Sequence, residues 1–92
     1  MPWVYILRCA DASLYVGLTD DLEARERAHR EGRGCSYTRR RTPVSLAYVE
    51  FFADEGEARD RERQLKRWSG KKKEALIAGR LETLKELSRR RT

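Results

Sequence analysis

Short apolar runs separated by strongly charged segments organise the chain. "WVYIL" at residues 3–7 and "LYVGL" at residues 14–18 are rich in aromatic and branched side chains. The polar residues 8–13 between them complete the pattern of a β-hairpin. A later run of the same kind, "VSLAYVEFF" at residues 44–52, predicts a third strand.

The charged segments carry helix signals. The segments that we expect to be helical cover residues 19–32, 54–70, 71–79 and 80–91. Thr19 or Asp20 can cap the first of them and Gly32 can end it, the second ends near Gly70, and Gly79 separates the last two. Residues 33–43 read as a polar, basic loop. The order β-β-α-β-α-α predicts an α+β fold, in which a small three-stranded antiparallel sheet is flanked by helices.

Several polar side chains are expected among apolar ones. In the strand at 14–18, alternation places Tyr15 and Gly17 together, opposite the apolar face, and Gly17 leaves room for a backbone to approach. In the first helix, Arg25 and His29 lie one turn apart on the face that also carries Leu22, Ala24 and Ala28. In the second helix, Glu62 lies at the edge of an arc formed with Ala58, Arg61, Leu65 and Trp68.

Inward charges are costly unless they share a polar site. The residues that could converge on one sheet face are Tyr5, Tyr15, Arg25, His29 and Glu62. Such a cluster indicates a functional site. The structural alternatives are an Arg–Glu ion pair, a core histidine bonded to a carbonyl, and core tyrosines. Periodicity alone leaves both interpretations open.

Charge narrows the class of partner. The chain has 92 residues, enough for one small domain, and a formal net charge of +6 with a pI of about 9.7. These values favour polyanions, either nucleic acid or an acidic membrane surface. No apolar run approaches the roughly 20 residues of a membrane span, and no basic leader precedes residues 3–7, so we expect neither a membrane protein nor a signal peptide. Cys9 and Cys35 lack a paired spacing, which predicts reduced thiols in a cytoplasmic protein.

Four stretches together resemble the GIY-YIG nuclease family. "VYI" at 4–6 and "YVG" at 15–17 are similar to the two half-motifs that name it, and "DLEARERAH" at 21–29 looks like the family helix that carries an arginine and a histidine. "EARDRERQLKRW" at 57–68 resembles the helix with the family's metal-binding glutamate, and "YTRRRTPVSLAYVE" at 37–50 resembles the link and third strand of the small single-domain bacterial members.

The likeness covers residues 2–78, which predicts a nuclease-like domain at residues 1–78 and a helical, basic C-terminal extension at 79–92 whose role is unassigned. Three positions depart from the family pattern. Trp3 stands where the first half-motif often has glycine, Val16 replaces isoleucine, and Arg30 follows His29 where many members have asparagine. The first two departures keep the tyrosines and the strand pattern.

The resemblance implies a metal-dependent endonuclease. It implies that Glu62 binds the metal, and that a tyrosine of the first half-motif acts as base with His29 assisting it. The sequence alone leaves open whether Tyr5 or Tyr15 takes the proton. Mg²⁺ (or Mn²⁺) tolerates a site with one protein carboxylate, because water and phosphate fill its other positions. Arg25 suits a scissile phosphate, since a guanidinium donates two parallel hydrogen bonds. We expect a DNA substrate chosen by structure rather than by sequence. The alternatives are a catalytically inactive nucleic-acid-binding module and a zinc protein using Cys9, Cys35 and His29.

A basic surface could hold the nucleic acid. The residues expected to contact it are Tyr37, Arg39, Arg40, Arg41, Arg63, Lys66 and Arg67. Lys71, Lys72 and Lys73 follow them along the chain. Tyr37 could stack on a base or pack against the fold. Because charge runs are most often solvated faces, both interpretations of this surface stay open.

Overall fold

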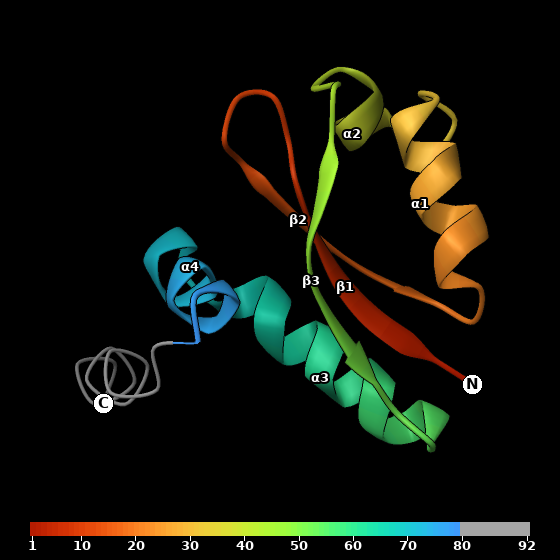
Figure 1. Ribbon diagram of the computed structural model, residues 1–92. Coiled ribbons are helices and arrows are strands. Elements are labelled where there is room, and N and C mark those ends of the chain that lie inside the picture. Colours follow the sequence, from red (N-terminus) through yellow and green to blue (C-terminus); the bar gives the residue numbers. More distant parts are fainter. Residues whose placement is uncertain (80–92) are drawn as a thin grey trace.

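The computed structural model describes residues 1–79 (Figure 1). The strands are β1 (Trp3–Arg8), β2 (Leu14–Thr19) and β3 (Ser45–Phe51). The helices are α1 (Leu22–Arg30), α2 (Ser36–Arg39), α3 (Glu55–Arg67) and α4 (Gly70–Ile77). The predicted α+β fold, with a three-stranded antiparallel sheet and helices in the expected order, is confirmed, with the short α2 as an addition. The helical segment predicted at residues 80–91 lies outside the described residues.

The sheet has the order β2-β1-β3, with β1 in the centre. Both neighbours pair with β1 in antiparallel fashion, and Tyr5 lies opposite Gly17 on one side and Val49 on the other. The register with β3 shifts between Ile6 and Leu7, which marks a local irregularity in that pairing. The edge strands β2 and β3 therefore bound the sheet, and side chains reach the helices from its two faces.

Each face of the sheet packs against a different pair of helices (Figure 1). On one face, Val4, Ile6 and Val16 form a buried cluster with Ala58 and Leu65 of α3. On the other face, the buried cluster contains Tyr5, Leu7, Cys9 and Val44, with Tyr15 and Leu22 packed against it. The alternation expected for residues 14–18 is therefore found, and both half-motif tyrosines lie on the α1 side.

Side-chain caps define where the helices begin. Asp21, Asp54 and Ser69 each accept a hydrogen bond from a backbone N–H in the first turn of α1, α3 and α4. Because Ser69 caps α4, Gly70 is the first residue of that helix and not the end of α3, which stops at Arg67. Gly79 has a φ of +73°, which agrees with the predicted break there.

Further local expectations were wrong. The cap of α1 is Asp21 and not Thr19 or Asp20. Residues 33–43 are not entirely a loop, because Ser36–Arg39 form the helical turn α2, which lacks a side-chain cap. Ala24 is exposed, so the apolar face of α1 is narrower than its sequence indicates. Lys72 is buried, with its Nζ 4.2 Å from the ring centroid of Trp68, so residues 71–73 are not a uniformly solvated run.

Within residues 1–79, no helix is both long and apolar enough to span a membrane.

Leu65 anchors α3 to the sheet and is fully buried. We expect Leu65→Ala to lower the free energy of unfolding by about 2–5 kcal/mol, because it removes buried methyl groups and leaves a cavity. Leu46→Ala is the matched control, since Leu46 on β3 is 37% exposed. Urea unfolding of both variants checks this, and equal losses would contradict the assigned core.

Candidate active site

The two half-motif tyrosines lie side by side on the α1 face of the sheet. Tyr5 is on β1 and Tyr15 on β2, and their ring centroids are 6.4 Å apart. Gly17 pairs directly with Tyr5, and a Cβ at Gly17 would overlap the Tyr5 phenol. The expectation that Gly17 admits a backbone was therefore wrong, because the Tyr5 ring fills that space. Glycine is required here so that the ring can extend across β2.

His29 joins the tyrosines from the last turn of α1. Its side chain is fully buried, its Nε2 lies 3.0 Å from the Tyr5 hydroxyl, and its ring centroid is 5.3 Å from that of Tyr15. Its Nδ1 lies 2.7 Å from the hydroxyl of Thr38 on α2. A Cβ at Gly34 would overlap the imidazole, so the loop after α1 passes close over this ring. The sequence-predicted pair of His29 and Tyr5 is thus in direct contact.

Arg25 lies one turn before His29 and is half-buried beside the Tyr5 hydroxyl. Burial raises the pKa of Tyr5, and the Arg25 charge offsets this only in part. Burial and the neighbouring Cys35 raise the pKa of Tyr15 to about 12. Burial and the Arg25 charge lower the pKa of His29. At neutral pH the site therefore holds two protonated phenols, a neutral imidazole and a permanent cation.

Glu62 lies on α3, the helix that packs against β2. The adjacent residue, Arg61, donates to Glu50 of β3 with an Nε–Oε1 distance of 3.0 Å, so it faces the β3 edge of the sheet. Ala58 and Leu65 face the sheet, and with about 100° per residue Arg61 and Glu62 lie on either side of that direction, which turns Glu62 toward the β2 edge. Its negative charge contributes to raising the pKa of Tyr5, in agreement with this position. The expected inward edge position of Glu62 is therefore what the structure contains.

The donor set fits a magnesium-type ion held by one carboxylate. The Glu62 side chain is 22% exposed and its Oε2 pairs with Nζ of Lys66 at 3.2 Å, so the carboxylate remains reachable. Mg²⁺ commonly uses one or two carboxylates and keeps water and phosphate as its other ligands. Within residues 1–79, no three His, Cys, Asp or Glu side chains are grouped as metal ligands. Cys9 and Cys35 are free thiols, and both ring nitrogens of His29 are hydrogen-bonded.

Comparison with known proteins accounts for this arrangement. A profile of the GIY-YIG catalytic domain matches residues 1–75. The chain belongs to the GIY-YIG family. GIY-YIG domains form a nuclease superfamily, so the resemblance seen in the sequence is confirmed.

The similar proteins are small UPF0213 proteins. One from Bacillus pumilus is 48% identical, over 82% of this chain and 76% of its own. One from Clostridium perfringens is also 48% identical, over 87% of this chain and 86% of its own. The solution NMR structure of a UPF0213 protein from Bacillus halodurans is 40% identical and superimposes with a TM-score of 0.58, covering 87% of this chain and 86% of that one.

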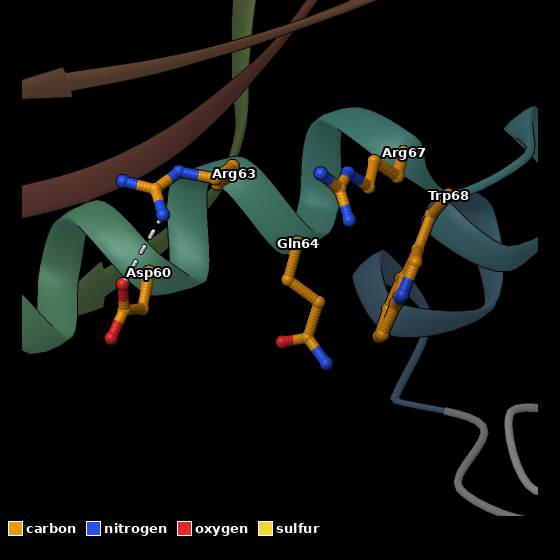
Figure 2. A pocket seen from close by; sticks show the side chains of 5 residues that line it. All are labelled: Asp60, Arg63, Gln64, Arg67 and Trp68. Atoms are coloured by element: carbon orange, nitrogen blue, oxygen red, sulfur yellow. Dashed lines mark ion pairs between the residues drawn. The ribbon is translucent and has the colours of Figure 1, made fainter.

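The basic residues on α3 of this GIY-YIG domain point in two directions. Lys66 lies one turn from Glu62, with which it pairs, and so faces the site. Arg63 and Arg67 line a shallow pocket together with Asp60, Gln64 and Trp68 (Figure 2). There, Nη1 of Arg63 lies 3.7 Å from a carboxylate oxygen of Asp60. This pocket is turned away from the sheet and does not contain the tyrosines.

The basic residues around α2 are partly engaged within the fold. Arg39 and Arg40 are exposed. Arg41 pairs with Asp11 at 3.1 Å, donates to the Tyr37 carbonyl at 2.9 Å and lies 3.8 Å from the Tyr37 ring centroid. The Tyr37 ring also neighbours Tyr15, at 5.9 Å between centroids. Both alternatives for Tyr37 are compatible with this packing, because the residue remains 36% exposed.

Sequence reasoning missed Thr38 and Gly34, which surround the His29 ring. Both lie in the segment 33–43 that reads as a loop, and a single helical turn has no periodicity that would reveal an inward threonine. A weak signal did exist, because "GCSYT" places a glycine and a β-branched hydroxyl residue directly after the His-bearing helix.

The lowered pKa of His29 makes folding stability dependent on pH. The unfolded chain, with an ordinary histidine pKa near 6.5, binds more protons at mildly acidic pH than the folded chain does. This stabilisation is therefore fully present above pH ~6.5 and is lost as the pH falls through the lower, folded-state pKa. We expect urea unfolding to show decreasing stability from pH 7 to pH 5. His29→Gln should flatten that slope, and an unchanged slope in this variant would contradict the assignment.

Proposed function

We propose that this protein is a divalent-metal-dependent endonuclease that hydrolyses phosphodiester bonds in DNA, choosing its substrate by structure rather than by sequence. The observation that carries the proposal is the packing of Tyr5, Tyr15 and His29 on the α1 face of the sheet, with Arg25 beside them. Tyr5, Tyr15, Arg25 and His29 come from one face, and Glu62 comes from the helix on the other. Membership in a nuclease superfamily agrees with that chemistry.

Tyr5 and His29 supply a route for the proton of the attacking water. In the proposed step, water gives a proton to the Tyr5 oxygen while the Tyr5 hydroxyl proton passes to Nε2 of His29, 3.0 Å away. The resulting hydroxide forms the new bond to phosphorus, the bond to the leaving oxygen breaks, and that oxygen takes up a proton from solvent. A neutral imidazole is required for this step, and the lowered pKa of His29 favours it.

Arg25 and Tyr15 serve the phosphate in this proposal. Arg25 remains charged at any working pH and can donate two parallel hydrogen bonds to phosphate oxygens. Tyr15 remains protonated, because its pKa is raised to about 12, so it can donate to the same group. Glu62 would hold Mg²⁺ or Mn²⁺, and such an ion would neutralise charge on the phosphoryl and leaving oxygens.

The substrate would be held through its phosphates. Lys66 flanks Glu62, and Arg39 and Arg40 extend exposed from α2. Arg63, Arg67, Arg41 and Tyr37 would contribute from the margins. A charge-driven contact of this kind is independent of sequence and weakens steeply with salt. The second candidate function is a nucleic-acid-binding module without activity, which is favoured by the ion pair that already engages Glu62.

Glu62→Gln tests the proposed function together with metal removal. We expect wild-type protein to cleave a panel of linear, nicked and branched DNA in Mg²⁺ or Mn²⁺ and to stop in EDTA, and we expect Glu62→Gln to be inactive while remaining folded. Asp60→Asn is the matched control, because Asp60 is an exposed acid on the same helix outside the site. Cleavage by Glu62→Gln at the wild-type rate would contradict the role of Glu62. If the wild type binds DNA without cleaving it, the result would favour an inactive nucleic-acid-binding module. If it cleaves only RNA, the proposed DNA substrate would be wrong.

Arg25→Ala separates a catalytic role of Arg25 from a structural one. Loss of one member of a buried ion pair typically costs about 3–5 kcal/mol. Within the described residues, no ion pair joins Arg25 to Glu62, so we expect Arg25→Ala to abolish cleavage with a much smaller change in unfolding free energy. Lysine should not restore activity, because it lacks the two-pronged geometry.

Arg27→Ala is the control for this prediction, since Arg27 is an exposed arginine on the opposite side of α1. Cleavage rate and urea unfolding are measured on all variants. Large, non-additive stability losses in Arg25→Ala, Glu62→Ala and their double variant would indicate a structural salt bridge instead.

A further inference from the structure

We propose that Thr38 is a positioning residue that sets the tautomer of His29, placing the ring hydrogen on Nδ1 so that Nε2 accepts the proton of Tyr5. The inference rests on the proposed function for its catalytic consequence, but the tautomer itself is a property of the resting protein. Thr38 touches neither the proposed phosphate position nor Tyr5; it acts through His29, at 2.7 Å.

The hydrogen-bond partners of Thr38 favour one direction for this bond. Its hydroxyl carries one hydrogen, and the backbone carbonyl of Cys35, at 3.3 Å, can only accept it. When the hydroxyl donates there, the Thr38 oxygen is an acceptor toward Nδ1, and the ring hydrogen is placed on that nitrogen. The Cys35 thiol, 3.4 Å from the same oxygen, is a further weak partner that can donate to it.

The neighbours of Tyr5 lead to the same tautomer from the other end. The Arg25 guanidinium beside the Tyr5 hydroxyl can only donate, so it favours a Tyr5 oxygen that is free to accept. In the opposite tautomer, Nε2–H would also donate to this oxygen, and the Tyr5 hydrogen would have no acceptor that the structure records within residues 1–79. With the hydrogen on Nδ1, each donor hydrogen in the hydrogen-bonded series Tyr5–His29–Thr38–Cys35 has an acceptor.

Burial raises the free-energy cost of any unmatched hydrogen-bond donor or acceptor in this arrangement. His29 and Thr38 are both 0% exposed and Tyr5 is 2% exposed, so an unmatched donor or acceptor here would be costly. Within residues 1–79, no buried side-chain nitrogen or oxygen lacks a hydrogen-bond partner. Helix α2 consists of little more than the turn that carries Thr38, and Gly34 lets this segment approach the imidazole. The local structure of residues 34–38 therefore serves to present one hydroxyl to His29.

The first experiment observes the tautomer directly and needs no substrate. His29 is the single histidine of the chain, so ¹⁵N NMR of uniformly labelled protein reports its imidazole alone. In wild type near pH 7.5 we expect a protonated, pyrrole-type Nδ1 and an unprotonated, pyridine-type Nε2. A protonated Nε2 in the wild type would overturn the proposal, whatever the activity of the protein.

The second experiment links the tautomer to the rate. Thr38→Ser keeps the hydroxyl and should retain both the Nδ1–H tautomer and cleavage within a few-fold of wild type. Thr38→Val keeps the shape but removes the acceptor, so it should lose that tautomer and cleave at least about tenfold more slowly, because a positioned proton acceptor contributes roughly 10²–10⁴-fold. Its affinity for a DNA duplex should be unchanged, since Thr38 contacts no substrate.

Thr42→Val is the matched control, because Thr42 is an exposed threonine that follows α2. Retention of the Nδ1–H tautomer or of full activity in a folded Thr38→Val would overturn the role of Thr38. If Thr38→Val does not fold, Thr38→Ser and the wild-type spectrum still decide, since a serine variant with a changed tautomer also contradicts the proposal. A wild-type protein that cleaves nothing but shows the Nδ1–H tautomer would overturn the proposed function while supporting the assignment of Thr38.

Discussion

The phenol ring of Tyr5 lies over Gly17, and the geometry of the site follows from this pairing. Tyr5 is on the central strand, and its ring extends over β2 only because the opposing residue has no side chain. A register shift of one residue would send Tyr5 to the α3 face and separate it from His29. The antiparallel pairing of β1 with β2 therefore also fixes the position of the Tyr5 hydroxyl, which lies beside Arg25 and His29 of α1.

A domain of this size can bury polar groups only if they are neutral and hydrogen-bonded. The groups at the centre of the site, Tyr5, His29 and Thr38, meet that condition through the chain of contacts at 3.0 Å and 2.7 Å. The charged groups, Arg25 and Glu62, remain half-buried at the margin, where water and substrate can solvate them. The charged groups stay at the margin because the low dielectric that keeps the buried imidazole neutral would also make a buried charge costly in free energy.

The elements that can be predicted from the sequence are those that leave a periodic or capping signal. Alternation places Val16 and Tyr15 on opposite faces. The four-residue spacing places Arg25 beside His29, whose pKa it helps to lower. The position of Thr38 could not be predicted in this way, because one helical turn has no period and its partner is nine residues away. The misassigned Gly17 has a similar cause: strand patterns reveal that a side chain is absent but not that a ring from the neighbouring strand fills the space. Lys72 was misjudged because a lysine in a basic run gives no sign that a tryptophan covers it.

The proposed site lies at an edge of the sheet, and this position bears on the kind of substrate. Helices α1 and α3 cover opposite faces of the sheet (Figure 1), so we infer that Arg25 of α1 and Glu62 of α3 approach each other at the β2 margin. The pocket of Figure 2 is instead on the outer side of α3, where Asp60 neutralises part of its positive charge. A margin with one cation from each helix, Arg25 and Lys66, suits a polymer whose phosphates pass along a surface, because these cations attract the negative charges of such a substrate.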